Sequence, residues 1–441
     1  MPLFGRKKSE EATTPGERWA PLPPAPEPGP DGLRSMEDHR DYLLSCLTEL
    51  PPFSQQIVDA LDLSICEDVY SSIDMPRFDN SAMDGYAVRA VDVAAATPER
   101  PVSLPVVGEV AAGQDALHRL SPGTAIKIMT GAPLPPAADA IVPYENTDRG
   151  ASDVRVHVAS VASQHVRYVG EDIRAGVQLF TAGDQLGPRD IGLLAAIGVD
   201  KVLVRPRPRV AVVSTGSELV EPGHELGHPH QIYDSNSAML AAAAKAAGAQ
   251  VFRVGLVGDE PQQVLQVISD QLVRADLILT TGGVSQGDYD VVKAVLPELG
   301  ATDFASVAMQ PGKPQGFGLI GDDRTPMIML PGNPVSAFVS FEAFVRPAIR
   351  KLLGVTPYTR PVVRAQATHD FRSAPGRRRL ARGIVSLDAD GGRLVELAGG
   401  HASHLLGDLA RANALVVLPE DVTEVAAGDD VEVWLLEEVY G

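Results

Sequence analysis

The residue types best suited to binding an anion together with a metal ion lie between Asp276 and Lys293. An apolar run at 277–279 predicts a strand buried on both faces. Residues that let a ligand approach backbone N–H groups closely follow it, namely Gly282, Gly283, Ser285 and Gly287. Acids flank the loop at Asp276, Asp288 and Asp290, and a helix can begin at the last two. This order predicts an anion site bridged by a divalent cation.

A plain strand–turn–helix connection would carry the same glycines, and only the acids favour a functional loop over it. The spacing matches neither the Walker A pattern nor the G-x-G-x-x-G fingerprint, so an ordinary nucleotide motif is not predicted. Lys293 has a simple alternative of its own, because it follows Asp290 by three residues and could form an ion pair along a helix.

Two further loops of this kind follow strands in the same part of the chain. Repeated strand–loop–helix units from residue 209 predict a parallel, doubly wound sheet, in which ligands bind outside the carboxyl ends of the strands. The loops 214–218, 281–286 and 331–334 should therefore gather at one edge of the sheet. Glu218 is the most specific candidate for a functional residue in the first of them. Lys313, flanked by Pro311 and Pro314, could stabilise negative charge there.

Other polar stretches are less specific. Residues 75–90 are too polar in the middle for a strand and predict a loop, although the acids and amides in it, Asp84 among them, would also suit a polar site. Around Thr130 and Asp139 a β-turn with a solvated acid is as good an interpretation as a functional loop. The basic cluster holding Arg377 and Arg382 could meet an anion, but a solvated strand edge is the commoner outcome.

Helices and strands must position these residues, and the sequence pattern divides the chain into segments of different predicted structure. Residues 1–35 predict a solvated, proline-stiffened tail. Ser35 should cap a helix, and Asp259 another that has Pro261 in its first turn. Other predicted helices cover 191–196, 236–247 and 337–353, and the predicted strands of the sheet cover 210–213, 251–257, 277–279 and 327–330. Short valine-rich runs at 91–165 and from 356 onwards predict two small β domains.

Composition excludes several classes of protein. The 441 residues carry 38 Lys and Arg against 57 Asp and Glu, and a net charge of −19 argues against a nucleic-acid binder. Cys46 and Cys66 are too few for a disulfide framework or a cysteine zinc site and suggest inert core residues. No apolar run is long enough to span a membrane and no signal peptide is evident, so a cytoplasmic protein is expected.

Eight motifs in order resemble the molybdopterin molybdenumtransferase family, which includes the C-terminal domain of gephyrin. They read DNSAMDGYA (79–87), TGAPLPPAADAIVPYE (130–145), GEDI (170–173), STGSEL (214–219), YDSN (233–236), TTGGVSQGDYD (280–290), PGKP (311–314) and LPGNPVS (330–336). The resemblance covers roughly residues 36–420.

The resemblance implies a multidomain α/β and β fold. It implies an elongated N-terminal domain from 36–90 and 166–205, an inserted β-module at 91–165, a doubly wound α/β molybdopterin-binding domain at 206–355, and a C-terminal β-barrel at 356–441. It also implies a homodimer whose active site is completed by the partner, with the upstream adenylyltransferase as a further candidate partner. The implied reaction inserts molybdate into adenylylated molybdopterin and releases AMP, with Mg²⁺ required.

The resemblance also implies roles for particular residues. The expected catalytic residues are Asp84, Asp139, Glu218, Asp276, Lys293 and Lys313. Glu218 and Asp234 are the expected Mg²⁺ ligands. The expected pterin and anion contacts are Thr215, Gly216, Ser235, Gly282, Gly283, Ser285, Pro311, Arg382 and Ser403.

Two departures from the family pattern stand out. Ser217 occupies a position that is often Asp, and the usual Gln-Gly-Ser-Gly stretch reads GGHASHLLG, with His401 and His404 around Ser403. A paralogue with altered anion or metal preference, or a tungsten-handling member, is therefore an alternative. Two other classes of protein are also compatible with parts of the sequence. One is a non-catalytic pterin-binding or scaffold paralogue, and the other is an adenylyltransferase, which would lack the β-module and barrel.

Overall fold

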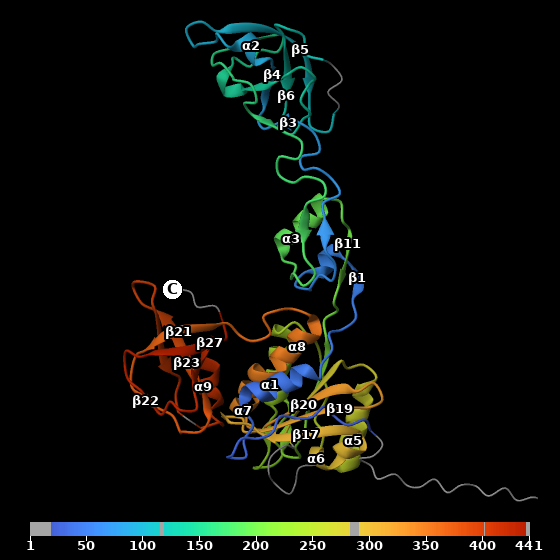
Figure 1. Ribbon diagram of the computed structural model, residues 1–441, viewed down its shortest axis with the longest axis vertical. Helices are drawn as coiled ribbons and strands as arrows, with labels where there is room; N and C mark the ends of the chain where they lie inside the picture. The colour runs from blue at the N-terminus through green and yellow to red at the C-terminus, as the bar shows by residue number, and fades with distance from the viewer. Residues whose placement is uncertain (1–18, 115–118, 283–290, 401, 438–441) are drawn as a thin grey trace, which may run out of the picture. The chain divides into compact units, whose positions relative to one another are not determined.

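The computed structural model describes residues 19–114, 119–282, 291–400 and 402–437. Contacts divide the chain into two compact units (Figure 1). The first unit comprises residues 1–54, 62–64 and 203–441, and the second comprises 55–61 and 65–202. The domain boundaries implied by the family resemblance stay a prediction.

A six-stranded sheet forms the centre of the first unit. Its order is β15 (Gln250–Arg253), β12 (Arg209–Ser214), β16 (Leu277–Thr281), β20 (Thr325–Leu330), β19 (Pro314–Ile320) and β17 (Gly300–Ser306). The first four strands are parallel, as the strand–loop–helix alternation predicts. β19 and β17 are antiparallel and were not predicted. They follow one another and lead into β20 without a helical crossover, so parallel pairing is not available to them.

Helices cover both faces of this sheet. On one face lie α1 (Met36–Ser45), α4 (Asn236–Ala246), α7 (Pro334–Ser340) and α8 (Arg346–Leu353), and on the other lie α5 (Pro261–Leu272) and α6 (Val291–Val295) (Figure 1). Alternate residues of β16 enter the two cores, Leu277 and Leu279 the first and Ile278 the second. The single helix predicted at 337–353 is interrupted by a π-helical turn, Phe341–Val345. Pro347 follows it and cannot donate the usual helical hydrogen bond.

The proline-rich segment 19–35 is bound to the first unit rather than solvated. Arg324 donates hydrogen bonds to the Ala20 and Pro21 carbonyls, and the Tyr42 hydroxyl donates to the Pro23 carbonyl. Leu22 and Ala25 pack against the core that includes α1. The predicted tail therefore does not describe residues 19–35, because contacts distant in sequence stabilise a segment that could build no core alone. We call it the N-terminal strap.

The C-terminal part of the first unit is a closed five-stranded barrel. Its strands are β21 (Val362–Ala367), β23 (Arg378–Leu387), β24 (Arg393–Leu397), β25 (Ala414–Leu418) and β27 (Asp430–Leu435). The sheet closes because β23 pairs with both β24 and β25. A two-residue strand of the α/β part, β18 (Met309–Gln310), pairs with the start of β23 and so joins the barrel to the α/β part.

The second unit contains a five-stranded sheet in the order β7 (Ala140–Pro143), β4 (Gly85–Val88), β6 (Ala125–Ile128), β5 (Val102–Val110) and β8 (Asp153–Val156). The loop predicted for 75–90 is wrong at its end, because β4 is a fully buried strand between β7 and β6. The unit also holds the predicted short helix as α3 (Pro188–Ala196), where the Asp190 carboxylate accepts from the Gly187 N–H at 2.8 Å.

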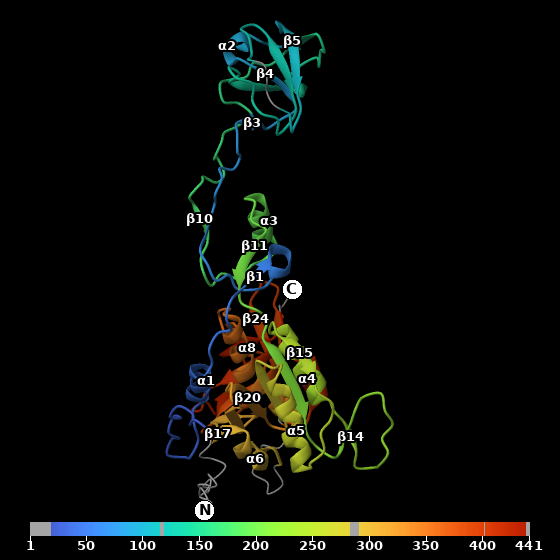
Figure 2. The same ribbon diagram turned by 90° about the vertical axis from the view of Figure 1, so that its right-hand side faces the viewer.

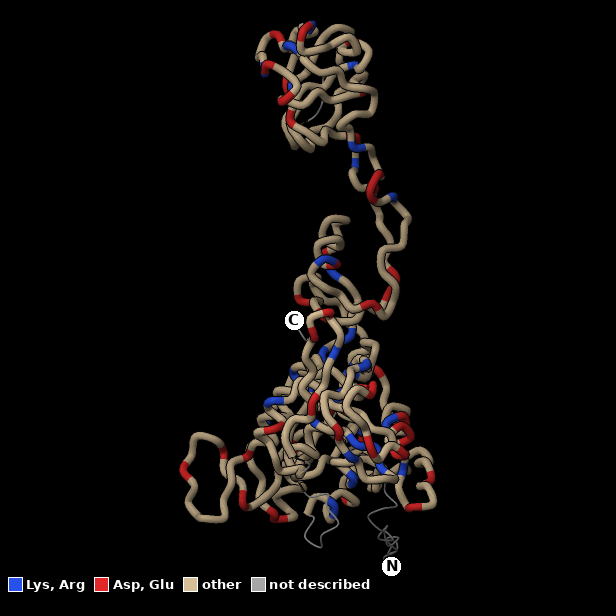
Figure 3. The backbone as a smooth tube through the Cα atoms, turned by 90° about the vertical axis from the view of Figure 1, so that its left-hand side faces the viewer, with Lys and Arg blue, Asp and Glu red and all other residues tan. Residues whose placement is uncertain are grey.

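Two expectations from composition can be compared with the described residues. Among them, no helix is long and apolar enough to cross a membrane. Cys46 and Cys66 form no disulfide there, and both are half-buried rather than core residues as expected. Burial raises the pKa of the Cys46 thiol. Lys and Arg lie among Asp and Glu along the backbone of each unit (Figure 3).

Candidate active site

A cavity of about 560 Å³ opens at the carboxyl edge of the parallel strands in the first unit. It is lined by the exit loops of β12, β16 and β20, which are the three loops predicted to meet there. The lining includes Ser214, Thr215, Glu218, Leu219, Ile232, Tyr233, Asp234, Ser235, Asn236, Thr281, Gly282, Gly332, Asn333, Pro334 and His404. This volume suits a small-molecule site.

Gly282 allows two of these loops to approach each other closely. Its φ is +90°, and a Cβ at this position would lie 2.8 Å from the Thr215 carbonyl oxygen. The Gly282 N–H donates to the Leu330 carbonyl at 3.2 Å, so it is already used within the fold. The N–H groups of Thr215 and Gly216 likewise donate to the carbonyls of Thr281 and Val257. The loops are thus fixed by their own backbone.

Asp234 is a buried carboxylate with one oxygen uncommitted. The residue is 1% exposed, and its Oδ1 accepts from the Ser214 hydroxyl at 3.2 Å and the Ser237 N–H at 3.0 Å. Its Oδ2 is buried and has no hydrogen-bond partner among the described residues. A buried carboxylate oxygen without a partner is costly. Because Asp234 also lines the cavity, this oxygen is a candidate ligand for a cation.

Glu218 lies exposed on the same cavity, on a loop that is held from both sides. The Ser217 N–H and hydroxyl both donate to Asp259 Oδ2, at 3.0 and 2.7 Å, and the Ile232 N–H donates to the Glu218 carbonyl at 2.9 Å. The prediction that Asp259 caps a helix is wrong, because Glu260 is the residue that precedes α5. Asp259 instead fixes the loop that carries Glu218.

Asn236 was not expected to be a site residue, yet it connects two of the three loops. Its side-chain NH₂ donates to the Thr281 hydroxyl at 2.9 Å and to the Gly332 carbonyl at 2.6 Å, while the residue itself begins α4 next to Ser235. The signal available in sequence was its place in the YDSN motif, two residues after Asp234.

Among the residues that the structure describes, the barrel contributes His404 to the cavity. Its loop is docked on the α/β part through the Ser403 carbonyl, which accepts from the Val335 N–H at 3.2 Å. His404 thus marks an approach of the barrel to the site. His401 lies outside the described residues.

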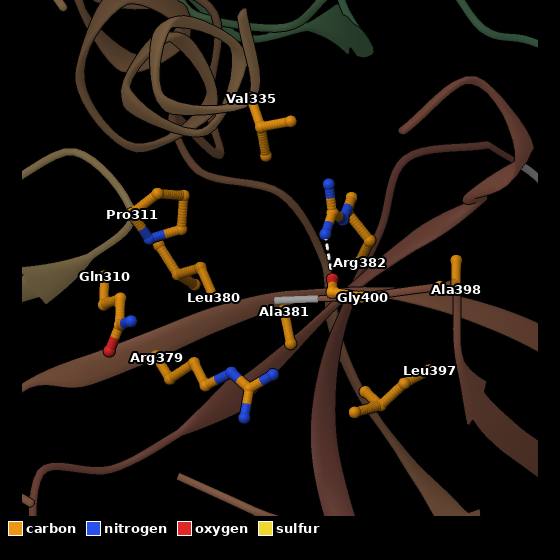
Figure 4. Close-up of a pocket in the computed structure, with 11 residues that line it drawn as sticks. Gln310, Pro311, Val335, Arg379, Leu380, Ala381, Arg382, Leu397, Ala398 and Gly400 are labelled. Atoms are coloured by element: carbon orange, nitrogen blue, oxygen red, sulfur yellow. Dashed lines mark hydrogen bonds between the residues drawn. The ribbon is translucent and has the colours of Figure 1, made fainter. Parts of the chain in front are cut away.

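Pro311 and Arg382 line a second, smaller cavity beside this junction, with room for about one water at about 20 Å³ (Figure 4). Arg382 is buried, and burial lowers its pKa. Its guanidinium donates to the carbonyl of Gly400 (Figure 4) and also to those of Ala402 and Leu405. Arg382 therefore shapes the loop that holds Ser403, and any contact with a substrate stays a prediction.

Three other predicted residues of the first unit do not line the large cavity. Asp276 lies at the opposite end of β16 and forms an ion pair with Arg209 at 2.8 Å. The Lys293 Nζ lies 5.1 Å from the centre of the Phe304 ring. Lys313 lies in the connection to β19, where its carbonyl accepts from the Val307 N–H. For Asp276 this placement favours a structural role, and the catalytic roles of all three stay predictions.

Asp84 and Asp139 belong to the second unit. Asp84 Oδ1 accepts from the N–H and the hydroxyl of Thr130, both at 2.7 Å, and these hydrogen bonds lower the pKa of Asp84. Asp139 Oδ1 accepts from the Ala90 N–H at 2.6 Å. Each acid therefore fixes a loop of the β-module, and their catalytic roles stay predictions.

The rest of the glycine loop, including Gly283, Ser285, Asp288 and Asp290, lies outside the described residues. Within the described ranges, no three His, Cys, Asp or Glu side chains are grouped so that they could hold a metal ion. Glu218 and Asp234 supply two carboxylates, which is a number that Mg²⁺ sites commonly use together with waters and substrate oxygens.

Known proteins share this organisation along most of the chain. Family models match residues 34–198 (MoeA N-terminal region, domain I and II), 211–351 (probable molybdopterin binding domain) and 364–436 (MoeA C-terminal region, domain IV). Molybdopterin molybdenumtransferase 2 of Mycobacterium tuberculosis (strain ATCC 25618 / H37Rv) is 44% identical over 91% of this chain and 99% of its own. Molybdopterin molybdenumtransferase of Nostoc sp. (strain PCC 7120 / SAG 25.82 / UTEX 2576) is 39% identical over 90% and 93%.

A crystal structure of a molybdopterin biosynthesis MoeA protein from Pyrococcus horikosii has a TM-score of 0.75 and 32% identity, covering 92% of this chain and 100% of its own. The predicted multidomain fold, with its doubly wound α/β domain and C-terminal barrel, is confirmed. The resemblance inferred from the eight motifs is confirmed as well, and the chain belongs to the molybdopterin molybdenumtransferase family.

Proposed function

We propose that this protein acts in molybdenum cofactor biosynthesis as a molybdopterin molybdenumtransferase. In the specific reaction, molybdate is inserted into adenylylated molybdopterin, AMP is released and Mg²⁺ is required. The relatives named above support the transferase, and the cavity at the carboxyl edge of the sheet supports a small-molecule site there.

The observation that carries the proposal is the charge of this cavity. Its described lining contains two carboxylates, Glu218 and Asp234, and no Lys or Arg. Molybdate and phosphate esters are anions, so they would be repelled by these groups unless a cation lay between them. The uncommitted Asp234 Oδ2 offers that cation an oxygen.

Mg²⁺, when bound, would neutralise the two carboxylates and polarise phosphate oxygens of the substrate. The chain's own residues would do the positioning. Asp259 holds Ser217 and hence the Glu218 loop, and Asn236 fixes the loops of Thr281 and Gly332 against each other. His404 would present a hydrogen-bond donor to the anion from the barrel side.

We also propose that the enzyme is a cytoplasmic homodimer whose partner completes the site, with the upstream adenylyltransferase as the source of its substrate. The second unit supports an interface by its exposed apolar side chains, among them Phe78, Tyr168 and Val169, each between 40 and 50% exposed. Light scattering on the purified protein should give twice the 46.7 kDa chain mass.

The test is AMP release from adenylylated molybdopterin, measured with and without molybdate and Mg²⁺. We expect release that needs both ions, and we expect Glu218→Ala to lower it by about 10²–10³-fold, the usual cost of removing a preorganised electrostatic group. Glu298→Ala is the matched control, because Glu298 is exposed on the same unit and does not line the cavity.

If Glu218→Ala releases AMP at the wild-type rate, the metal is not held at this carboxylate. If the wild-type protein binds the pterin but never releases AMP, the protein is a non-catalytic pterin-binding member of the family.

A further inference from the structure

The loop between β13 (Leu219–Val220) and β14 (Ile232–Tyr233) carries three histidines within seven residues, His224, His228 and His230. The proposed transferase reaction makes no use of them. All three side chains are exposed, and Figure 2 shows the loop projecting into solvent beside β14. Short histidine-rich tracts are a composition typical of metal binding.

The first five residues of this tract read HELGH and so match the H-E-x-x-H spacing of zinc peptidases. In those enzymes the two histidines face one way because they are four residues apart on a helix. Here residues 221–231 form no helix, and Pro229 follows His228 directly. A peptidase site is therefore excluded by the local structure, while the imidazoles remain available as ligands.

The base and the middle of the loop are firmly held. The Ile232 N–H donates to the Glu218 carbonyl at 2.9 Å and the Asp234 N–H donates to the Val220 carbonyl at 3.0 Å. Within the loop, the Gln231 side-chain oxygen accepts from the N–H groups of Gly227 and His228, at 2.7 and 3.1 Å. These bonds satisfy the backbone internally, so the imidazoles are left on the outside.

One imidazole is already oriented as metal-binding histidines usually are. His224 Nδ1 lies 3.3 Å from the Glu221 carbonyl oxygen, and the Tyr233 hydroxyl donates to the His224 carbonyl at 3.1 Å. A ring N–H that donates to a backbone carbonyl fixes the tautomer and leaves Nε2 as the coordinating atom. In the described part of the chain, the rings of His228 and His230 have no hydrogen-bond partner that would compete with a metal.

We propose that this loop binds a borderline transition-metal dication, with Zn²⁺ as the probe, through the imidazoles of His224, His228 and His230. Imidazole nitrogens suit Zn²⁺, Ni²⁺ and Cu²⁺, and Mg²⁺ prefers oxygens. Glu225 or a water can take the fourth position of a tetrahedral site. In the part of the chain that the structure describes, these side chains are not already grouped as a metal site. Binding therefore requires the imidazoles to turn towards one another, while the hydrogen-bonded base of the loop stays in place.

This site is separate from the cavity but covalently continuous with it, since the loop begins next to Glu218 and ends next to Asp234. A bound ion holds the loop that joins these two carboxylates in one conformation. The proposal does not depend on the proposed reaction, because metal binding is measured without any substrate.

The experiment is a titration of the full-length, metal-stripped protein with Zn²⁺, in competition with a chromophoric chelator and in the presence of excess Mg²⁺. We expect one bound Zn²⁺ per chain that Mg²⁺ does not displace, and tighter binding when Cu²⁺ replaces Zn²⁺. The double variant H228A/H230A should bind at least 10–100-fold more weakly, since even the loss of a group that only supports a metal ligand costs about that much.

The matched control is H157A/H369A, which also removes two histidines, both outside the loop. Both variants should keep the circular dichroism of the wild type. Three results overturn the proposal. The first is that the wild-type protein takes no Zn²⁺ from the chelator. The second is that H228A/H230A binds Zn²⁺ as tightly as the wild type. The third is that Glu218→Ala loses Zn²⁺ binding while H228A/H230A retains it. The last would place the ion in the cavity.

Discussion

At the scale of single residues, His39 lies in α1 with its imidazole removed from water. It is 1% exposed, its Nδ1 lies 3.1 Å from an Arg34 guanidinium nitrogen, and the Phe344 ring packs edge-on at 4.9 Å. Burial, followed by the charge of Arg34, lowers the pKa of His39 to about 3, against a smaller opposing effect of Asp303. The neutral form is therefore the one that the fold accepts.

This burial predicts an acid sensitivity of the first unit. Because the folded-state pKa lies below the unfolded value of 6.5, the unfolded chain binds more protons between these values. The contribution of His39 is fully present above pH 6.5 and is lost as the pH falls towards about 3, at up to about 1.4 kcal/mol per pH unit. Urea unfolding at several pH values should show this slope.

Trp19 and Trp434 are the two tryptophans of the chain and both belong to the first unit, so their fluorescence reports its unfolding. His39→Asn should have a smaller slope of stability against pH between 6.5 and 4 than the wild type. His369→Asn, a change at an exposed histidine, should keep the wild-type slope. Equal slopes in all three proteins would mean that His39 does not stay neutral in the fold.

The sequence predicts the residues of the cavity better than their partners. Glu218 and Gly282 follow predicted strands, and strand ends of a parallel sheet must meet. Asp234 was expected from the YDSN motif of the family resemblance. Asp259, in contrast, binds Ser217 from 42 positions away, and Asp276 binds Arg209 from 67. Such pairs depend on the tertiary fold, which local pattern does not encode. Asp276 therefore looked like a site residue although it lies at the far end of β16.

At the scale of elements, the turn after β16 predicts a strict need for glycine. Alanine at Gly282 would have to keep a φ of +90° and would place its Cβ 2.8 Å from the Thr215 carbonyl oxygen. We expect Gly282→Ala to lower the free energy of unfolding of the first unit by at least about 1–2 kcal/mol, the usual cost of a left-handed conformation. Urea unfolding followed by tryptophan fluorescence measures it.

Gly407→Ala is the matched control for this substitution. Gly407 lies in α9 (Leu406–Arg411) of the same unit, has no positive φ and has open space where its Cβ would be. Alanine there should raise stability by about 0.5–1 kcal/mol, because glycine weakens a helix. If Gly282→Ala is as stable as the wild type, the loop does not have the described backbone.

The β4 strand shows why the sequence missed an element. Its flanks are rich in turn residues, yet all four of its residues are buried between β7 and β6. At Gly85 an added Cβ would lie 2.1 Å from the Val142 carbonyl oxygen, so only glycine lets the two strands approach. A glycine that permits close approach of two strands and a glycine that makes a turn look alike in a single sequence.

The N-terminal strap has a similar explanation. Proline-rich composition correctly predicts that residues 19–35 build no core of their own, but Arg34 pairs with Asp303 of β17 at 2.7 Å and the strap lies on an existing core. Composition describes what a segment can do alone and contains no information about the surface it will find.

At the scale of the whole molecule, the two units have separate hydrophobic cores and should unfold separately. We expect two transitions in calorimetry, only one of which coincides with the change in tryptophan fluorescence. Gly282→Ala should lower the temperature of the transition that tryptophan fluorescence reports, and leave the other transition unchanged. Gly192→Ala, in open space within α3 of the second unit, should raise only the other. A single transition that both variants shift would mean that the units unfold cooperatively.

The order of the elements along the chain also determines when the first unit can fold during synthesis. Helix α1 is made at the start of the chain, but its apolar residues, such as Leu43, pack in a core shared with α8, which follows roughly 300 residues later. At about 5–20 residues per second, a ribosome needs on the order of 15–60 s to cover that distance. The second unit, complete by residue 202, can fold in this interval. Newly made α1 must meanwhile wait with its apolar side uncovered, which makes it a natural place for a chaperone to hold the nascent chain.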